Sequence, residues 1–376
     1  MDSANRYIEQ KLNERLLLGN YRILRTNSNL VDFCSNDYLG FARSPRLKQL
    51  IETEIQGHTS FLNGSTGSRL LAGNTEYAIE LEQQIAAAHH TEAGLLFNSG
   101  YDANIGMFSS LPQRGDTVLH DELIHASIID GIRLSNANKY SFRHNDLQHL
   151  EDKLKRAAGQ RYVAVESIYS MDGDAAPLKE LCNLCEQYGA GLIVDEAHAT
   201  GLFGRGLVEQ LHLQNKVFAR IITFGKALGS HGSIVLGNRL LIDYLINFAR
   251  SFIYTTAAPF HQLASVKMAY RLLDQSGEQV QQLKQHISAF KKAISNSSCI
   301  PILNSHSSIQ CIVAGSTASA RQMALKLQNT GLDARAILSP TVAAGTERIR
   351  ICLHSFNTAD EIELLTGTIL QLSHEQ

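Results

Sequence analysis

The segment Leu192–His198 reads LIVDEAH, a short apolar run that ends in two acidic residues. A short apolar run bounded by polar residues is consistent with a strand buried in a parallel sheet. Open α/β sheets bind their ligands at the carboxyl ends of their strands, which is where Asp195 would lie. The segment therefore makes Asp195 a candidate site residue. Taken alone, it also fits a buried aspartate that only accepts backbone N–H bonds.

Similar runs recur on both sides of this segment and alternate with helical periodicity. The β-prone runs lie at 94–97, 117–120, 138–142, 161–168, 191–195, 221–224 and 233–237. Helical patterns lie between them, and one of these follows Asn145 and Asp146, residue types that cap a first helical turn. This alternation predicts an α/β fold with a mostly parallel seven-stranded sheet between helices.

The pattern changes after Pro259. A helical stretch rich in Gln and Lys runs to about residue 292, and short strands near 309–313 and 348–353 flank a further helix. These elements predict a smaller α+β domain, whereas the start of the chain combines a charged, helix-prone segment with turn residues. We expect an N-terminal arm at 1–50, a large domain at 51–258 and a small C-terminal domain at 259–376.

Composition and charge exclude several classes of protein. The 376 residues are 44% hydrophobic and 19% charged, as in folded globular chains. Lys and Arg total 34 against 36 Asp and Glu, so we expect no nucleic-acid partner. No apolar run reaches the roughly 18 residues that span a membrane, and no secretory signal is visible. Sparse cysteines suit a reducing, cytoplasmic setting. We expect free thiols at Cys34, Cys182, Cys185, Cys299, Cys311 and Cys352.

Two further motifs are expected at the same edge of the sheet as Asp195. Asn98–Tyr101 follows an apolar run and precedes a helical pattern. Free N–H groups at a helix start bind phosphate, although a plain strand-to-helix turn has the same composition. Lys226 follows the run at 221–224, where a partly desolvated lysine is nucleophilic toward an aldehyde. An aldehyde, a ring nitrogen that pairs with a carboxylate, and a phosphate together describe pyridoxal phosphate.

Two histidines fit this site, whereas competing motifs lack their partners. One of His125 and His198 can stack on the pyridine ring while the other donates to its phenolic oxygen. The letters DEAH also occur in nucleic-acid helicases, but the chain has no G-x-x-x-x-G-K-[ST] loop. Cys182 and Cys185 have no second pair for zinc, so we expect core packing there and no metal site.

With these motifs in place, the chain resembles the α-oxoamine synthases, a family of fold-type I pyridoxal-phosphate enzymes, over nearly its whole length. The supporting segments are SNDYLG at 35–40, NGSTGSR at 63–69, FRHND at 142–146, SMDGD at 170–174, VDEAHATG at 194–201, TFGKALG at 223–229 and IYTT at 253–256. Residues 339–350, SPTVAAGTERIR, resemble a family signature with Ala343 in place of the usual proline. Ala78 stands where relatives often carry histidine.

The resemblance implies a role for each matching residue. Lys226 would bind the cofactor as an imine, Asp195 would pair with its ring nitrogen, and His125 would stack on its face. His198 and Ser170 would lie near its phenolic oxygen. The implied phosphate ligands are Ser99, Gly100, Tyr101, Thr223 and, from the partner subunit of a homodimer with shared active sites, Thr255 or Thr256. The implied substrate ligands are Asn36 and Arg350 for the amino-acid carboxylate, Arg22 and Thr341 for the acyl-CoA, and also His125.

The segment at 339–350 is similar to that of the family member that condenses L-alanine with pimeloyl-CoA in biotin synthesis, releasing coenzyme A and carbon dioxide. Relatives that join glycine to acetyl-CoA, or serine to palmitoyl-CoA, share the cofactor motifs and remain alternatives. A non-catalytic subunit on the same fold is the alternative from another class. The joint presence of Lys226, Asp195, His125 and His198 disfavours it.

Overall fold

The computed structural model describes residues 2–24, 26, 29–60, 63–295 and 301–374. Contacts between residues group the chain into two units. The sheet unit comprises Asn36–Ser170 and Asp174–Leu283, and the terminal unit comprises Met1–Ser35, Met171–Gly173 and Lys284–Gln376. The domain boundaries expected from the sequence, 1–50, 51–258 and 259–376, remain a prediction.

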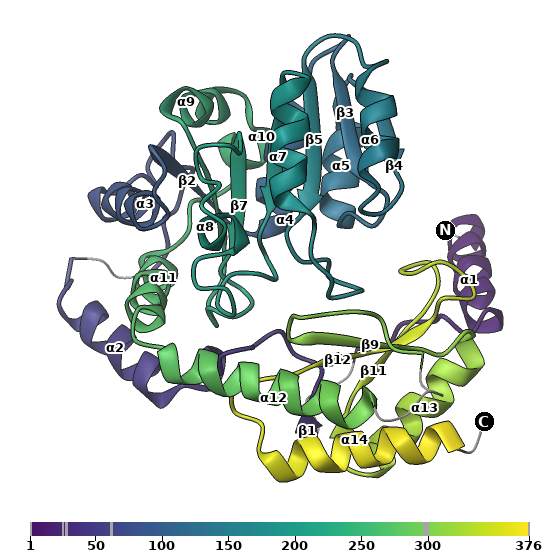
Figure 1. The fold of residues 1–376 in the computed structure, drawn as a ribbon. Helices are drawn as coiled ribbons and strands as arrows, with labels where there is room; N and C mark the ends of the chain where they lie inside the picture. The colour runs from purple at the N-terminus through teal and green to yellow at the C-terminus, as the bar shows by residue number, and fades with distance from the viewer. Residues whose placement is uncertain (1, 25, 27–28, 61–62, 296–300, 375–376) are drawn as a thin grey trace. The chain divides into compact units, whose positions relative to one another are not determined.

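The described residues of the sheet unit include seven strands that form one sheet (Figure 1). The strands are β2 (Ala93–Phe97), β3 (Thr117–Asp121), β4 (Asn138–Phe142), β5 (Arg161–Glu166), β6 (Ala190–Asp195), β7 (Ala219–Thr223) and β8 (Ser233–Gly237). Their order is β2-β8-β7-β6-β5-β3-β4, and β8 runs antiparallel to both of its neighbours. The other described pairs are parallel. The predicted mostly parallel seven-stranded sheet is confirmed.

Helices pack on both faces of this sheet because side chains alternate between the faces along each strand. On β6, Ile193 belongs to one buried cluster, which also contains residues of α4, α5 and α9. Its neighbours Leu192 and Val194 belong to a second cluster, with residues of α6, α7 and α8. The helices and the short η1 of this unit are η1 (Phe41–Arg43), α2 (Pro45–Gln56), α3 (Glu76–Ala88), α4 (Gly100–Ser110), α5 (Ala126–Leu134), α6 (Leu147–Leu154), α7 (Leu178–Gln187), α8 (Leu207–Gln210), α9 (Arg239–Phe248), α10 (Arg250–Ile253) and α11 (Phe260–Leu273).

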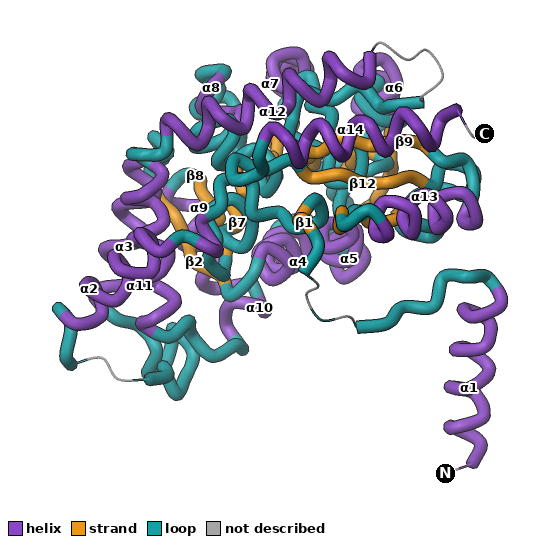
Figure 2. The backbone as a smooth tube through the Cα atoms, turned by 90° about the horizontal axis from the view of Figure 1, so that it is seen from below, coloured by secondary structure: helices purple, strands orange, loops and turns teal. Residues whose placement is uncertain are grey.

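In the terminal unit, the described strands form a three-stranded antiparallel sheet and a two-stranded parallel one. Figure 2 shows α13 and α14 beside the orange strands β9 and β12. The elements are α1 (Asp2–Leu17), β1 (Val31–Asp32), β9 (Ile309–Val313), α13 (Thr317–Asn329), β10 (Leu332–Asp333), β11 (Arg335–Ile337), β12 (Arg348–Cys352) and α14 (Ala359–His374). The predicted strands near 309–313 and 348–353 and the helix between them are present.

Local sequence explains where several elements begin and end. The Asp146 side chain accepts a hydrogen bond from the His149 N–H and caps α6, as its position before the helix predicts. The helical stretch expected after Pro259 is divided, because α11 ends at Leu273 and α12 (Gly277–Ser295) begins after three intervening residues. The division between the two units falls within α12.

The cysteines agree with a reduced protein where the structure describes them. Cys34, Cys182, Cys185, Cys311 and Cys352 form no disulfide. Cys182 and Cys185 are buried in the second core cluster, so the predicted core packing is confirmed. Cys299 lies outside the described residues. Within the described part of the chain, no helix combines the length and the apolar character that crossing a membrane requires.

Candidate active site

Asp195 is the last residue of β6, and its carboxylate is held by two donors. Oδ1 accepts the backbone N–H of Ala197 at 3.0 Å, and Oδ2 accepts the side-chain amide of Asn104 at 2.9 Å. Asn104 is on α4, on the face of the sheet that carries the first core cluster. Asp195 is therefore a buried, fixed anion at the carboxyl edge of the sheet, where the sequence places it.

Lys226 follows the neighbouring strand β7 and begins a chain of hydrogen bonds. Its Nζ lies 2.6 Å from Nε2 of His198, whose Nδ1 lies 2.7 Å from the hydroxyl of Tyr38. Tyr38 donates to Oδ1 of Asn36 at 3.0 Å. Because Tyr38 uses its one proton on Asn36, His198 donates to it from Nδ1 and accepts from Lys226 at Nε2. The structure thus brings the predicted residues Lys226, His198 and Asn36 together.

The predicted phosphate site lies at the start of α4. Ser99 caps this helix, because its Oγ accepts the N–H of Asp102 at 3.0 Å. Gly100 lies against Thr223 at the end of β7, since a Cβ added to Gly100 would meet Thr223 Oγ1 at 3.4 Å. Tyr101 points elsewhere, because its exposed hydroxyl donates to Asp130 at 2.6 Å. Ser99, Gly100 and Thr223 therefore converge, and the part expected of Tyr101 remains a prediction.

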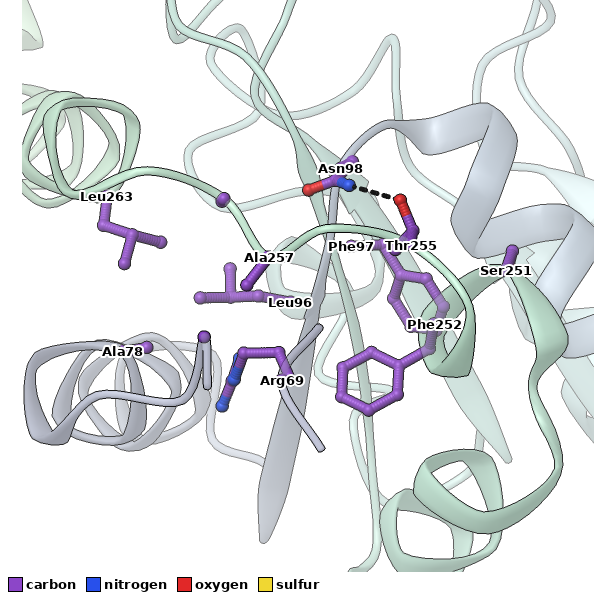
Figure 3. A pocket seen from close by; sticks show the side chains of 12 residues that line it. Arg69, Ala78, Leu96, Phe97, Asn98, Ser251, Phe252, Thr255, Ala257 and Leu263 are labelled. Carbon is purple, nitrogen blue, oxygen red and sulfur yellow. Dashed lines mark hydrogen bonds between the residues drawn. The ribbon is translucent and has the colours of Figure 1, made fainter. Parts of the chain in front are cut away.

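Thr255 lies close to the same helix start within its own chain. The Asn98 side chain donates to Thr255 Oγ1 at 3.0 Å and to the Thr256 carbonyl at 2.8 Å. Figure 3 shows Asn98 and Thr255 pointing toward one another at a mainly apolar pocket, which Ala78 also lines. A role of these threonines across a subunit interface remains a prediction.

His125 caps α5 and is solvent-exposed. Its Nδ1 accepts the backbone N–H of Ser127 at 3.2 Å and lies 2.7 Å from the Ser127 hydroxyl. Partial burial lowers the pKa of His125, and the charge of Asp195 opposes that effect. The exposed imidazole is available for the expected stacking on a ring.

Glu166 is a site residue that the motifs did not nominate. It is the last residue of β5 and pairs in register with Asp195 on β6. Its Oε2 accepts the backbone N–H of Ser170, a predicted site residue, at 3.2 Å, whereas Oε1 has no hydrogen-bond partner among the described residues. Burial, and next the charge of Asp195, raise the pKa of Glu166 to about 8. The strand-end rule that selected Asp195 applies equally to Glu166.

Glu196, next to Asp195, belongs to the core rather than to the site. Its Oε2 lies 2.6 Å from Nη2 of Arg220, and both side chains are fully buried. Its Oε1 accepts the N–H of Val208 at 3.0 Å. The second acid of the DEAH sequence is therefore a structural partner of arginine, and the helicase interpretation gains no support from it.

The terminal unit holds the other predicted substrate ligands. Arg350 on β12 is buried, and its Nη1 donates to the Cys352 sulfur at 3.0 Å. Arg22 Nη2 donates to Thr341 Oγ1 at 3.5 Å, so the two residues expected to contact an acyl-CoA lie together. Asn36 belongs to the sheet unit, and its joint role with Arg350 remains a prediction.

The residues of the sheet unit fit pyridoxal phosphate on chemical grounds. Lys226 supplies an amine, Asp195 a buried carboxylate with two fixed donors, and Gly100 a helix start without a side chain in the way. A mostly parallel sheet with these groups at the carboxyl ends of β6, β7 and β2 defines a transferase of the fold-type I class.

Comparison with known proteins identifies the family within that class. The family model Aminotransferase class I and II matches residues 28–369, and the chain belongs to this family. The 8-amino-7-oxononanoate synthase of Emericella nidulans is 45% identical, over 91% of this chain and 89% of the relative. The predicted membership of the α-oxoamine synthases is confirmed.

Solved structures agree with this placement. A serine palmitoyltransferase variant from S. paucimobilis with a bound PLP–myriocin aldimine has a TM-score of 0.89 and 26% identity, covering 99% of this chain and 98% of that one. An 8-amino-7-oxononanoate synthase from Francisella tularensis has a TM-score of 0.79 and 28% identity, covering 92% and 97%.

Proposed function

We propose that this protein uses pyridoxal phosphate to condense L-alanine with pimeloyl-CoA, or another pimeloyl thioester, giving 8-amino-7-oxononanoate, coenzyme A and carbon dioxide. The observation that carries the proposal is the arrangement of Lys226, His198 and Asp195 in a chain 45% identical to an 8-amino-7-oxononanoate synthase. The product would be an intermediate of biotin synthesis.

In this proposal, the predicted site residues of the sheet unit bind different parts of the cofactor. Lys226 would hold its aldehyde carbon, Asp195 its ring nitrogen and His125 its ring face, with Ser170 and His198 near the phenolic oxygen. Ser99, Gly100 and Thr223 would hold the phosphate. When bound, pyridoxal phosphate withdraws electrons from the α-carbon of the amino acid and makes the α-proton acidic. The fixed negative charge of Asp195 favours the protonated ring that withdraws electrons best.

Lys226 and His198 supply the proton transfer. The Lys226 amine must lose a proton before it can take the α-proton of alanine. His198 accepts a hydrogen bond from that amine at 2.6 Å through its Nε2 lone pair, so it is placed to share the proton. Tyr38, which is fully buried, holds the opposite edge of the His198 ring and fixes the direction of Nε2. Substituting His198 would therefore slow proton transfer without removing the Lys226 amine.

The residues proposed to bind alanine and the acyl-CoA include side chains that can bind anionic groups. Arg350 can form a bidentate pair with the alanine carboxylate, and Asn36 can donate from its side-chain amide. Arg22 and Thr341, which lie together at 3.5 Å, would contact the acyl-CoA.

A second candidate is the condensation of serine with palmitoyl-CoA. It is favoured by the similarity to serine palmitoyltransferase structures, at TM-scores up to 0.89. The identity to that structure is 26%, against 45% for the 8-amino-7-oxononanoate synthase relative, so the first candidate is preferred.

Release of coenzyme A tests the proposal directly. Alanine, glycine and serine are each combined with acetyl-, pimeloyl- and palmitoyl-CoA, with Lys226→Ala as the inactive control. We expect alanine with pimeloyl-CoA to react fastest and to release one carbon dioxide for each coenzyme A. Faster reaction of serine with palmitoyl-CoA would replace the first candidate with the second. No reaction of any pair would overturn both.

A further inference from the structure

Two fully buried side chains connect the predicted ring-stacking histidine to the predicted ring-nitrogen carboxylate. Asn104 on α4 is 2% exposed, and Ser127 on α5 is 0% exposed. Neither is among the site residues that the motifs nominate. Asn104 Nδ2 lies 2.9 Å from Asp195 Oδ2 and 2.9 Å from Ser127 Oγ, and Ser127 Oγ lies 2.7 Å from His125 Nδ1. The four side chains therefore form one continuous series of hydrogen bonds.

The chemistry of Asp195 fixes the direction of the first two bonds. An ionised carboxylate can only accept, so the group of Asn104 that faces it is the NH₂ group. The second N–H of that group then donates to Ser127 Oγ. Asn104 Oδ1 is buried and has no hydrogen-bond partner in the described part of the chain. Burying a carbonyl oxygen without a hydrogen-bond partner is unfavourable. The favourable contribution of Asn104 is therefore its two donated hydrogen bonds.

The direction of the next bond follows from Ser127. Because its oxygen accepts from Asn104, the hydroxyl proton is available to His125 Nδ1. The backbone N–H of Ser127 also donates to Nδ1, at 3.2 Å. Both donors require a lone pair on Nδ1, and a neutral imidazole with a lone pair on Nδ1 carries its proton on Nε2.

The charges around His125 are compatible with a neutral ring. Desolvation by the surrounding residues lowers the pKa of His125, although part of the residue is open to solvent, and Lys226 adds to this effect. Asp195 and Asp130 act in the opposite direction, but the pKa stays below its ordinary value. The imidazole is therefore neutral at neutral pH, and its tautomer is set by the hydrogen bonds at Nδ1.

We propose that Asn104 and Ser127 are positioning residues, which hold the Asp195 carboxylate in one orientation and the His125 imidazole with its proton on Nε2. These two residues, with His125 and Asp195, form a relay of hydrogen bonds. In the proposed reaction, the relay would keep His125, which would stack on the cofactor ring, neutral, and Asp195, which would pair with the ring nitrogen, anionic. That purpose rests on the proposed function. The relay itself is a property of the protein without cofactor, so it can be tested separately.

The tautomer is measured by nitrogen NMR of the cofactor-free protein labelled with ¹⁵N-histidine. His125→Gln identifies the His125 signals by their loss. Above the pKa of the ring, we expect Nδ1 at the chemical shift of an unprotonated nitrogen and Nε2 at that of a protonated one. The reverse pattern, with the proton on Nδ1, would overturn the proposal whether or not Ser127→Ala and Asn104→Leu fold.

Ser127→Ala removes the hydroxyl donor to Nδ1. We expect the two His125 nitrogen shifts to move toward each other, as the two tautomers become mixed. Ser110→Ala is the matched control, because Ser110 is also a buried serine and lies at the end of α4. Among the described residues, its hydroxyl donates only to the Gly106 carbonyl of the same helix, at 2.6 Å. Unchanged His125 shifts in a folded Ser127→Ala protein would contradict the relay.

Asn104→Leu removes both donors while keeping a side chain of similar volume. We expect equilibrium dialysis to show about tenfold weaker binding of pyridoxal phosphate, the loss expected for a hydrogen bond to a charged group. Ser110→Ala should bind as the unmodified protein does. If Asn104→Leu leaves both cofactor affinity and His125 shifts unchanged, the relay is wrong, whereas failure of the condensation assay alone overturns only the proposed function.

Discussion

Two carboxyl groups, Asp195 and Glu166, occupy paired positions on neighbouring strands but have different surroundings. Asp195 accepts N–H groups at 3.0 and 2.9 Å, whereas the bond from the Ser170 N–H to Glu166 Oε2 is longer, at 3.2 Å. Burial and the nearby Asp195 charge raise the pKa of Glu166 to about 8. At neutral pH Glu166 therefore keeps its proton.

Replacing Glu166 with Gln should change how stability depends on pH. The folded protein keeps the Glu166 proton to about pH 8, whereas an unfolded Glu loses it near its ordinary pKa of about 4.3. The folded state thus binds more protons across this window, so its free energy of unfolding falls as pH rises. We expect a smaller fall for Glu166→Gln, measured by urea unfolding of the cofactor-free protein at about pH 5 and pH 8. Parallel pH profiles would contradict this assignment.

At the scale of elements, the buried ion pair between Glu196 and Arg220 links strands β6 and β7 to neighbouring loops. Glu196 follows β6, and Arg220 is on β7. Arg220 also donates to the His89 carbonyl after α3 at 3.2 Å and to the Arg205 carbonyl before α8 at 2.9 Å. The pair therefore ties the edge of the sheet that carries Asp195 to two helix ends.

Replacing Glu196 with Gln should destabilise the protein strongly, because it leaves the Arg220 charge buried without an anion. We expect a loss of about 3–5 kcal/mol in the free energy of unfolding, measured with urea. The matched control is Glu52→Gln, which breaks an exposed pair with Lys48 at 3.8 Å and should cost less than about 1 kcal/mol. Equal losses for the two variants would show that Glu196 has no special structural role.

A charged histidine joins the end of β3 to two loops. His144 Nδ1 lies 3.0 Å from Asp121, and its Nε2 lies 2.7 Å from Asp174. Burial opposes its protonation, but the hydrogen bonds to both carboxylates raise the pKa of His144 to about 10. The imidazolium thus connects FRHND at 142–146 with SMDGD at 170–174, two of the family motifs.

His144→Gln should remove a stabilising contribution that depends on pH. A folded pKa of about 10 lies above the ordinary value of about 6.5, so the contribution is complete below about pH 6.5 and disappears as pH rises through 10. We expect the unmodified protein to exceed the variant in unfolding free energy at about pH 6, with the difference narrowing toward pH 10. A difference that stays constant over this range would contradict a charged His144.

At the scale of the whole molecule, we predict a homodimer in which Thr255 or Thr256 serves the site of the partner subunit. A chain with Lys226→Ala is mixed and refolded with a chain carrying both Thr255→Ala and Thr256→Ala. If the threonines act across the interface, mixed dimers contain one complete site and regain activity that each parent lacks. No recovery, although native mass spectrometry shows mixed dimers, would place the threonines in the site of their own chain, as the Asn98–Thr255 bond at 3.0 Å also permits.

The parts of this fold that are predictable from sequence are those specified locally. β-prone runs that alternate with helical periods identified all seven strands of the sheet. Most of these strands are recognisable because a buried strand needs an apolar segment, whereas the edge strand β4, with the sequence NKYSF, is mostly exposed. The cap at Asp146 is equally local. In contrast, β10 and β11 have two and three residues, too few for a periodicity to be recognised.

The candidate site divides in the same way. Lys226, Asp195 and Ser99 could be identified because each lies at the end of a recognisable strand or shortly after it. Asn104 could not, since a lone polar residue on a helix has no local sign of a partner 91 positions away. The environment that raises the pKa of Glu166 likewise depends on burial and on register with β6, neither of which is local.

Borohydride reduction followed by peptide mass spectrometry tests whether Lys226 carries pyridoxal phosphate covalently. Reduction fixes the link between amine and cofactor, so the modified lysine can be located. We expect one modified peptide, containing Lys226, and none from Lys226→Ala protein treated in the same way. A modified peptide elsewhere, or an unmodified Lys226 in protein that has bound the cofactor, would contradict it.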